Sequence, residues 1–403
     1  MRALIYYILC WSTIALLVPG GPWWVLVFVV AVLTTAPIVV FMARRRWSRY
    51  PTAAFRLLVV RPVLYVQLLL PLVSGAGIIG LGLGALFGAP LAGGRIAALS
   101  VLGVLLTLFA FGYVGSKLLV VRDVRVTVPG LPAEFNGLTI AQLSDLHVGP
   151  QTSQAFLRHI ARTVAGIGPD LIAITGDLID DRSEDVAAFA CGLGGLRASL
   201  GVYIIPGNHD IYAGWDQVQY SLKSDYPATV LVNDSHVIER GSAKLTIVGT
   251  GDPAGRRRGF EKLNAAPDID KALANVPEGA TVVALAHNPA LWPALAAKGV
   301  TLTLSGHTHW GQFAIPQLGW SLASPFQERA MGVHQEGDSM LYIHPGTGYW
   351  GLPFRLGARP EVTRITLQSG DEAAIMMSPA RATSCGATRP QPRSAPHQEP
   401  SPA

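Results

Sequence analysis

Seven side chains of the types that bind divalent metals follow short apolar segments of this 403-residue chain. They are Asp145, His147, Asp177, Asn208, His287, His307 and His309. Carboxylate, amide oxygen and neutral imidazole are the ligands of borderline to hard divalent cations. The absence of cysteine from this set argues against a structural zinc site. The pattern therefore suggests a metal centre with nitrogen and oxygen ligands.

Each of these residues taken alone has an ordinary structural explanation. An aspartate after a strand commonly caps a helix, and an isolated histidine is commonly a core or surface residue. Asn208 follows Gly207 and could be a turn residue. The whole set is harder to explain by packing, because these groups buried together without a cation would repel one another or remain unsatisfied.

The elements that must position these groups are five short apolar segments, which we interpret as buried strands. They cover residues 138–143, 171–174, 202–205, 281–285 and 300–304. Helical patterns such as 153–166 and 290–298 lie between them, and residues 122–128 alternate like a half-buried strand. We expect two packed sheets flanked by helices, with the polar groups just beyond the carboxyl ends of the strands.

The two Asp-x-His and His-x-His pairs have a spacing of two residues. On a strand this spacing puts both side chains on one face, which would aim Asp145 and His147 at the same site, and likewise His307 and His309. The pairs would diverge instead if the chain turned immediately after the strand.

The order of the motifs resembles that of the calcineurin-like metallophosphoesterases over roughly residues 138–367. The matching segments are Asp145-Leu146-His147, Gly176-Asp177, Gly207-Asn208-His209-Asp210, His287 and Gly306-His307-Thr308-His309. The resemblance implies a four-layer α-β-β-α sandwich that holds two divalent metal ions, for which Mn, Fe and Zn all suit the ligands. By position it implies a first metal on Asp145, His147, Asp177 and His309, and a second completed by Asn208, His287 and His307, with Asp177 bridging.

The resemblance also implies a hydrolase of phosphodiester or pyrophosphate bonds that uses a metal-bridging hydroxide. His209 would stabilise the transferring phosphoryl group or protonate the leaving oxygen, and Asp210 would orient it. Capping of the following helix is the alternative role for both residues. The alternative function is a non-catalytic scaffold or binding module. Relatives of that kind usually lose a ligand or the histidine, and this chain keeps them.

Residues 344–361 resemble the closing region of the membrane-attached bacterial branch of the family. Arg355 and Arg359 could clamp a second phosphate or a carboxylate, or form salt bridges that hold the C-terminal strands. Trp310 stands where many members of this branch have glycine. Its indole could stack on a base or sugar, or pack on acyl chains. Trp350 and Phe354 would form an apolar wall.

The N-terminal third differs in composition from the rest of the chain. Residues 1–121 contain no acidic residue and nine of the 31 basic ones, which leaves 22 basic against 26 acidic residues in the remainder. This balance argues against a nucleic-acid partner. Four apolar stretches, at residues 4–19, 23–43, 62–87 and 96–114, predict a membrane anchor of about four helices. A signal peptide is the alternative for the first stretch.

These features predict an anchor at 1–121, a metallophosphoesterase domain at 122–377 and a disordered tail at 378–403, rich in Pro and Ser. Six arginines between the second and third stretches predict a multi-pass protein of the cell (inner) membrane with a cytoplasmic catalytic domain. The anchor favours a lipid-linked phosphoester substrate, and the branch also includes enzymes of nucleotide-linked substrates. The spans lack Asp, Glu, Lys and His, which argues against a transporter. The sequence does not indicate an oligomeric state.

Overall fold

The computed structural model describes residues 2–44 and 55–383 and divides the chain into two compact units. One unit comprises Met1–Val114 with Gly351–Phe354, and the other comprises Gly115–Trp350 with Arg355–Ala403. The arginines predicted to set the membrane topology lie partly at residues 45–54, outside the described residues.

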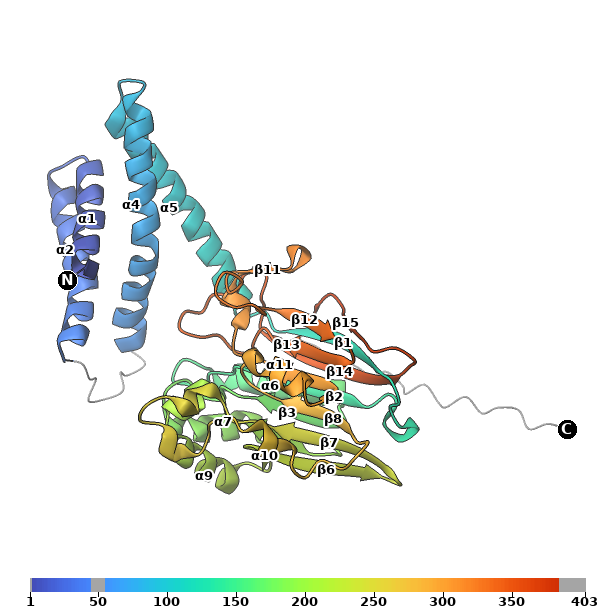
Figure 1. Cartoon of the computed structure of the whole chain (residues 1–403). Helices are drawn as coiled ribbons and strands as arrows, with labels where there is room; N and C mark the ends of the chain where they lie inside the picture. The colour runs from blue at the N-terminus through green and yellow to red at the C-terminus, as the bar shows by residue number, and fades with distance from the viewer. Residues whose placement is uncertain (1, 45–54, 384–403) are drawn as a thin grey trace. The chain divides into compact units, whose positions relative to one another are not determined.

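The first unit is helical, as the apolar stretches predict. Its helices are α1 (Arg2–Leu17), α2 (Pro22–Arg44), α4 (Arg61–Ala85, after a π-helical turn at Arg56–Val60) and α5 (Pro90–Gly115) (Figure 1). Two segments, Leu58–Ala85 and Pro90–Gly115, are long and apolar enough to cross a membrane. The shorter apolar segments Ile5–Leu17 and Pro22–Ala36 belong to α1 and α2.

The second unit contains two large sheets and a small pair of strands. The first sheet has the order β15 (Ala374–Met377), β1 (Val120–Val128), β14 (Glu361–Ser369), β2 (Thr139–Leu143), β3 (Leu171–Thr175), β4 (Val202–Ile205) and β5 (Thr229–Val230), with β16 (Arg381–Ala382) also paired to β1. Strands β2, β3, β4 and β5 run parallel, which brings their carboxyl ends to one edge.

The second sheet has the order β12 (Gly332–Glu336), β13 (Ser339–Ile343), β9 (Leu302–Ser305), β8 (Thr281–Leu285), β7 (Ala243–Gly249) and β6 (Asp234–Arg240). Its central strands β7, β8, β9 and β13 are parallel. The small pair consists of β10 (Ala314–Ile315) and β11 (Trp320–Ser321).

Apolar residues from both sheets meet in one core, which includes Ile140, Leu171, Leu245 and Leu304. The outer face of the first sheet is covered by α6 (Gln154–Ile167), α7 (Val186–Leu193) and α9 (Trp215–Asp225), whose apolar sides pack on β2, β3 and β4. Helices α10 (Ile269–Leu273) and α11 (Trp292–Ala296) cover the second sheet (Figure 1). The expected four-layer α-β-β-α sandwich is therefore confirmed.

Two expectations are corrected. The helix expected at 290–298 is a short 3-10 turn, Pro289–Leu291, followed by α11. The tail was expected to be disordered from residue 378, but Arg381–Ala382 pairs with β1, and the Arg381 guanidinium contacts the Asp123 carboxylate. An edge strand can recruit polar residues through its backbone, and a hydropathy argument misses this. Residues 384–403 lie outside the described residues.

Candidate metal centre

All seven residues predicted to bind metal come together where the strands of the two sheets end. Asp145 and His147 follow β2, Asp177 follows β3, and Asn208 begins helix α8 (Asn208–Tyr212) after β4. From the second sheet, His287 follows β8, while His307 and His309 follow β9. The two layers thus contribute ligand-type groups to one region.

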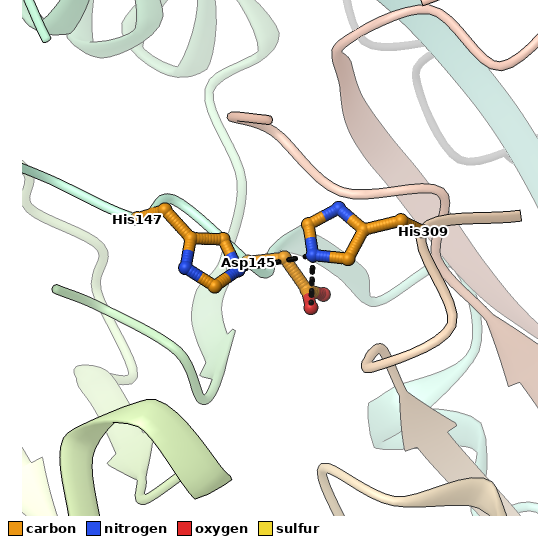
Figure 2. Close-up of side chains that lie close together, drawn as sticks. All are labelled: Asp145, His147 and His309. Carbon is orange, nitrogen blue, oxygen red and sulfur yellow. Dashed lines mark hydrogen bonds and ion pairs between the residues drawn. The ribbon is translucent and has the colours of Figure 1, made fainter. Parts of the chain in front are cut away.

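The first cluster consists of Asp145, His147 and His309 (Figure 2). The Nε2 atoms of the two histidines are 3.0 Å apart, and His309 Nε2 lies 3.3 Å from Asp145 Oδ1. The Asp145 carboxylate also accepts hydrogen bonds from the Ser144 hydroxyl at 2.6 Å and from the His307 backbone N–H at 3.0 Å. All three side chains are buried and directed to a common point.

The second cluster is built around Asn208 Oδ1. His307 Nδ1 lies 2.8 Å from this oxygen, and His287 Nε2 lies 3.3 Å from it. The other nitrogen of His287, Nδ1, donates to the Thr175 carbonyl at 2.8 Å, which leaves Nε2 to face the cluster. Such a backbone partner fixes the orientation of a ligating imidazole.

Asp177 lies between the two clusters. Its Oδ2 is 3.5 Å from His147 Nε2 and 3.3 Å from His287 Nε2. Two cations held close together need a shared anionic ligand, and this carboxylate occupies the corresponding position. The donor set, its burial and its division into two groups joined by one carboxylate fit a pair of divalent ions.

The backbone at these positions is strained. Among the described residues, nine other than glycine have a left-handed φ, and seven of them are Asp145, His147, Asp177, His307, His309, Trp310 and Gln312. A non-glycine residue in this region costs roughly 1–3 kcal/mol, and such residues cluster at functional sites. The expectation that strand alternation aims the ligand pairs is wrong, because β2 ends at Leu143 and β9 at Ser305. The chain turns at once, and the left-handed turns direct the side chains.

Two glycines allow this close packing. A Cβ atom on Gly207 would overlap Asp177 Oδ1, and one on Gly306 would overlap Ser144 Oγ and Asp145 Oδ2. Any larger residue would therefore displace a carboxylate of the cluster. This is the close backbone approach that a glycine before each ligand predicts.

The charges of the cluster favour metal binding. Burial lowers the pKa of His147 to about 3 and that of His307 to about 4, and it also lowers the pKa of His309. These imidazoles are therefore neutral at neutral pH. Burial opposes the cation of His287, yet Asp177 and Asp145 raise its pKa well above the usual range. The negative charges of these carboxylates thus favour a positive charge at this position, which is the charge that a metal cation would supply.

His209 lies beside the clusters, and its orientation is fixed by the backbone of another residue. Its N–H donates to Asp177 Oδ1 at 2.8 Å, and its ring Nδ1 lies 2.7 Å from the carbonyl oxygen of Asp180. A carbonyl only accepts, so Nδ1 carries a proton and donates it to this oxygen, which leaves Nε2 for other partners. Its ring centroid is 4.7 Å from that of His147.

Asp210 does not orient His209, contrary to expectation. Its buried carboxylate accepts the backbone N–H groups of Gly207 at 2.8 Å, Leu178 at 3.0 Å and Ile179 at 3.2 Å. It therefore ties the loop after β3 to the start of α8, the capping role left open by the sequence. Burial raises the pKa of Asp210 to about 7, and the neighbouring Asp177 acts in the same direction.

Comparisons with known proteins agree with this geometry. The model of the calcineurin-like phosphoesterase family matches residues 138–311. A metallophosphoesterase of Bacillus subtilis, YkuE, is 31% identical over 59% of this chain and 82% of its own length. The chain belongs to the calcineurin-like phosphoesterase family.

Other relatives of this chain come from animals and bacteria. A "transmembrane protein with metallophosphoesterase domain" of Danio rerio is 34% identical, over 62% of this chain and 57% of that protein. An uncharacterized metallophosphoesterase of Helicobacter pylori is 32% identical, over 59% and 61%. The chain thus spans less than two thirds of these relatives. Among solved structures, the sulfate thiohydrolase SoxB of Thermus thermophilus is 14% identical, with a TM-score of 0.34, over 62% of this chain and 57% of that one.

A cleft of about 370 Å³ opens onto the candidate metal centre. Its lining includes Asp177, Asn208, His209 and His307, together with Gln312 and Trp350. Gln312 and Trp350 hold each other through two 3.0 Å hydrogen bonds, from Gln312 Nε2 to the Trp350 carbonyl and from the Trp350 N–H to Gln312 Oε1. Trp350 is 52% exposed and lines the cleft, as expected, whereas Phe354, expected to form an apolar wall with it, is not among the lining residues.

Trp310 does not line the cleft, so the expected stacking on a substrate is wrong. Its ring is fully buried among Trp292, Leu341 and Ile343, and its Nε1 donates to the Ile343 carbonyl at 2.8 Å. The left-handed turn at Trp310 rotates the ring away from the metal centre and into the core. Its neighbour in sequence, Gly311, lines the cleft instead.

Arg355 and Arg359 behave differently from the expected clamp or salt bridges. Arg355 is buried, and its guanidinium donates to the carbonyls of Pro345, Gly348 and His309 and, at 2.8 Å, to His309 Nδ1. It therefore fixes the orientation of the His309 ring, a proposed metal ligand, through a hydrogen bond to Nδ1. Burial lowers the pKa of Arg355 to about 9. Arg359 is exposed, and no ion pair joins it to the other described residues. The C-terminal strands are held instead by Arg122, whose Nε lies 2.6 Å from Glu361 Oε2.

Sequence analysis overlooked Asp252, Tyr212 and Gln312. Asp252 follows β7 after Thr250 and Gly251, and its charge helps to raise the pKa of His287. The rule that found the other groups, a polar residue after a strand, would also have found this one. Tyr212 and Gln312 reach the site through tertiary contacts that spacing does not reveal.

We expect the affinity for Mn²⁺ or Zn²⁺ to fall as the pH is lowered. Burial raises the pKa of Asp145 to about 6, so below that pH a proton competes with the metal for its carboxylate. His287, with its raised pKa, must also release a proton, which extends the competition above pH 6. Each displaced proton changes the affinity about tenfold per pH unit.

Calorimetric titration of the metal-stripped full chain between pH 5 and 8 measures this dependence. Repeating the titration in two buffers with different ionisation enthalpies counts the released protons. An affinity that is constant over this range, with no proton release, would contradict the prediction.

Proposed function

We propose that this protein is a two-metal hydrolase of phosphodiester or pyrophosphate bonds, anchored to a membrane by its N-terminal helices. The observation that carries the proposal is the pair of ligand clusters joined by Asp177. Asp145, His147 and His309 would hold one ion with Asp177, while Asn208, His287 and His307 would hold the other with it. When bound, such ions neutralise phosphoryl oxygens and acidify water.

The residues around the clusters supply the remaining functions. His209 lines the cleft, and its Nδ1 is occupied by the Asp180 carbonyl. Its Nε2 would therefore donate a proton or a hydrogen bond to a phosphoryl or leaving oxygen. Arg355 keeps the His309 ring in place from the opposite side. Trp350 and Gln312 limit the width of the cleft and give the substrate an apolar surface.

The alternative, a scaffold on a phosphoesterase fold, is disfavoured by the same geometry. A scaffold needs no strained backbone at its vestigial ligands, yet five of the seven proposed ligands here have a left-handed φ. That strain is retained only where surrounding structure enforces it, most often for function.

The anchor is the basis for the proposed location and substrate. We propose that the helices of residues 1–121 form a multi-pass anchor, that residues 122–377 form the catalytic domain, and that this domain faces the cytoplasm. Two segments with the length and hydropathy of membrane spans support the anchor. An anchored active site stays near the bilayer, which favours a lipid-linked diphosphate or a nucleotide-linked lipid precursor as substrate.

A substrate panel with controlled metal loading tests the proposal. The full chain in detergent is stripped of metal, reloaded with Mn²⁺, Fe²⁺ or Zn²⁺, and assayed on bis(p-nitrophenyl) phosphate, p-nitrophenyl phosphate and a lipid-linked diphosphate. We expect hydrolysis only after reloading, and loss of turnover on renewed chelation. Turnover that survives chelation would overturn the two-metal proposal. Good hydrolysis of the nitrophenyl diester with none of the lipid-linked diphosphate would remove only the proposed substrate.

A further inference from the structure

Three successive arginines, Arg256, Arg257 and Arg258, follow the second sheet's strand β7 through a 3-10 turn, Pro253–Arg256. All three are exposed, and a run of this kind is usually a solvated surface. Arg256 Nη2 donates to the Pro267 carbonyl at 3.0 Å, which ties it to its own loop. Arg257 is different, because it is bound to a residue of the metal centre's own helix.

That residue is Tyr212, the last residue of α8. The Arg257 guanidinium lies over the Tyr212 ring, 5.5 Å from its centroid, and its Nη1 donates to the Tyr212 hydroxyl. Phe260 packs against the same tyrosine, with ring centroids 5.5 Å apart. Stacking and hydrogen bonding together restrict a side chain that would otherwise move freely.

Tyr212 places the guanidinium beside the cleft. Its ring centroid is 5.8 Å from that of His209, which lines the cleft and stands next to the ligand Asn208. His209 also contacts Trp350, with ring centroids 6.1 Å apart. Ring contacts therefore connect Arg257, through Tyr212, to His209, a residue that lines the cleft.

Among the described residues Arg257 forms no ion pair, although its charge interacts with the buried Asp252 carboxylate at longer range. Among the residues that the structure describes, no carboxylate lies within 4.0 Å of its guanidinium, and the Tyr212 hydroxyl is its one hydrogen-bond partner. Most of the five guanidinium donors remain available to a ligand.

We propose that Arg257, held on Tyr212, binds a second anionic group of the substrate, a phosphate or a carboxylate, next to the phosphoryl group that is cleaved. This inference rests on the proposed function and narrows its substrate class. The substrate carries at least two anionic groups, as a diphosphate does, and a simple diester would leave the guanidinium unused. A planar guanidinium suits either oxyanion, because both offer two oxygens in one plane.

The test uses four substrates. Three are p-nitrophenyl phosphodiesters of glycerol, of glycerol phosphate and of glycerate, which share the cleaved bond and differ only in a distal hydroxyl, phosphate or carboxylate. The fourth, bis(p-nitrophenyl) phosphate, reports the proposed function in the wild-type chain. Arg257→Gln is compared with Arg258→Gln, which removes the same charge one residue away, and with Arg257→Lys.

We expect wild type to prefer the two-anion substrates, and Arg257→Gln to reduce that preference, measured as a ratio of kcat/KM values, about tenfold through KM. Arg258→Gln should keep the preference, and Arg257→Lys should restore part of it. A greater loss for the phosphate or the carboxylate substrate identifies the anion. If wild type cleaves bis(p-nitrophenyl) phosphate but the ratio is the same in Arg257→Gln, the anion site is wrong and the proposed function stands. If wild type cleaves neither these four substrates nor the lipid-linked diphosphate, both are wrong.

Discussion

Replacing Asp177 with alanine is expected to lower turnover below about 1% of wild type and to reduce the bound metal below two ions per chain. The reason is its position between the clusters, with Oδ2 at 3.5 Å from His147 and 3.3 Å from His287. Its Oδ1 also accepts the His209 N–H at 2.8 Å, so the substitution loosens His209 as well.

Metal analysis by mass spectrometry, together with kinetics on reloaded protein, checks this expectation. Asp371→Ala is a suitable control, because it removes an exposed carboxylate from the turn between β14 and β15. The control should keep its metal and its rate. Two tightly bound ions and undiminished turnover in Asp177→Ala would exclude a bridging role.

The sequence predicted which residues gather at the site, because the ends of buried parallel strands converge. Six strand ends now supply polar groups, including Asp252, which the same argument could have found. The sequence did not predict the directions in which the ligand side chains point. The pleat would have set their direction if β2 and β9 had extended to Asp145 and His307, but both strands stop earlier and a left-handed turn takes over.

The remaining errors concern residues whose role depends on tertiary contacts. Trp310 directly follows a ligand, yet one left-handed φ sends its ring into the core. Arg355 carries the charge of a phosphate clamp, but burial commits its donors to carbonyls and to His309. In both cases the residue type indicates what the side chain can bind, and only the fold shows which partner it reaches. For the same reason the sequence alone did not reveal the contact between Arg257 and Tyr212, because the two residues are 45 positions apart.

The second large effect is expected from His209→Gln, which should lower turnover about 100- to 10,000-fold while both metal ions remain bound. Nδ1 donates to the Asp180 carbonyl, so any proton given to the substrate must come from Nε2, and glutamine cannot supply an acidic proton there. Metal should be retained because His209 is not one of the seven proposed ligands. Loss of an ion would instead show that His209, which can converge with His147 and Asp177, is itself a ligand.

The leaving group separates the two roles proposed for His209. A proton donor matters most for an alkoxide and little for p-nitrophenolate, which leaves without protonation, whereas a group that stabilises phosphoryl oxygens matters equally for both. We therefore compare His209→Gln on an alkyl and a nitrophenyl diester, with His159→Gln on the distant helix α6 as the matched control. A loss at least tenfold larger for the alkyl ester identifies the general acid, and equal losses identify charge stabilisation. Wild-type rates on both esters would remove His209 from the mechanism.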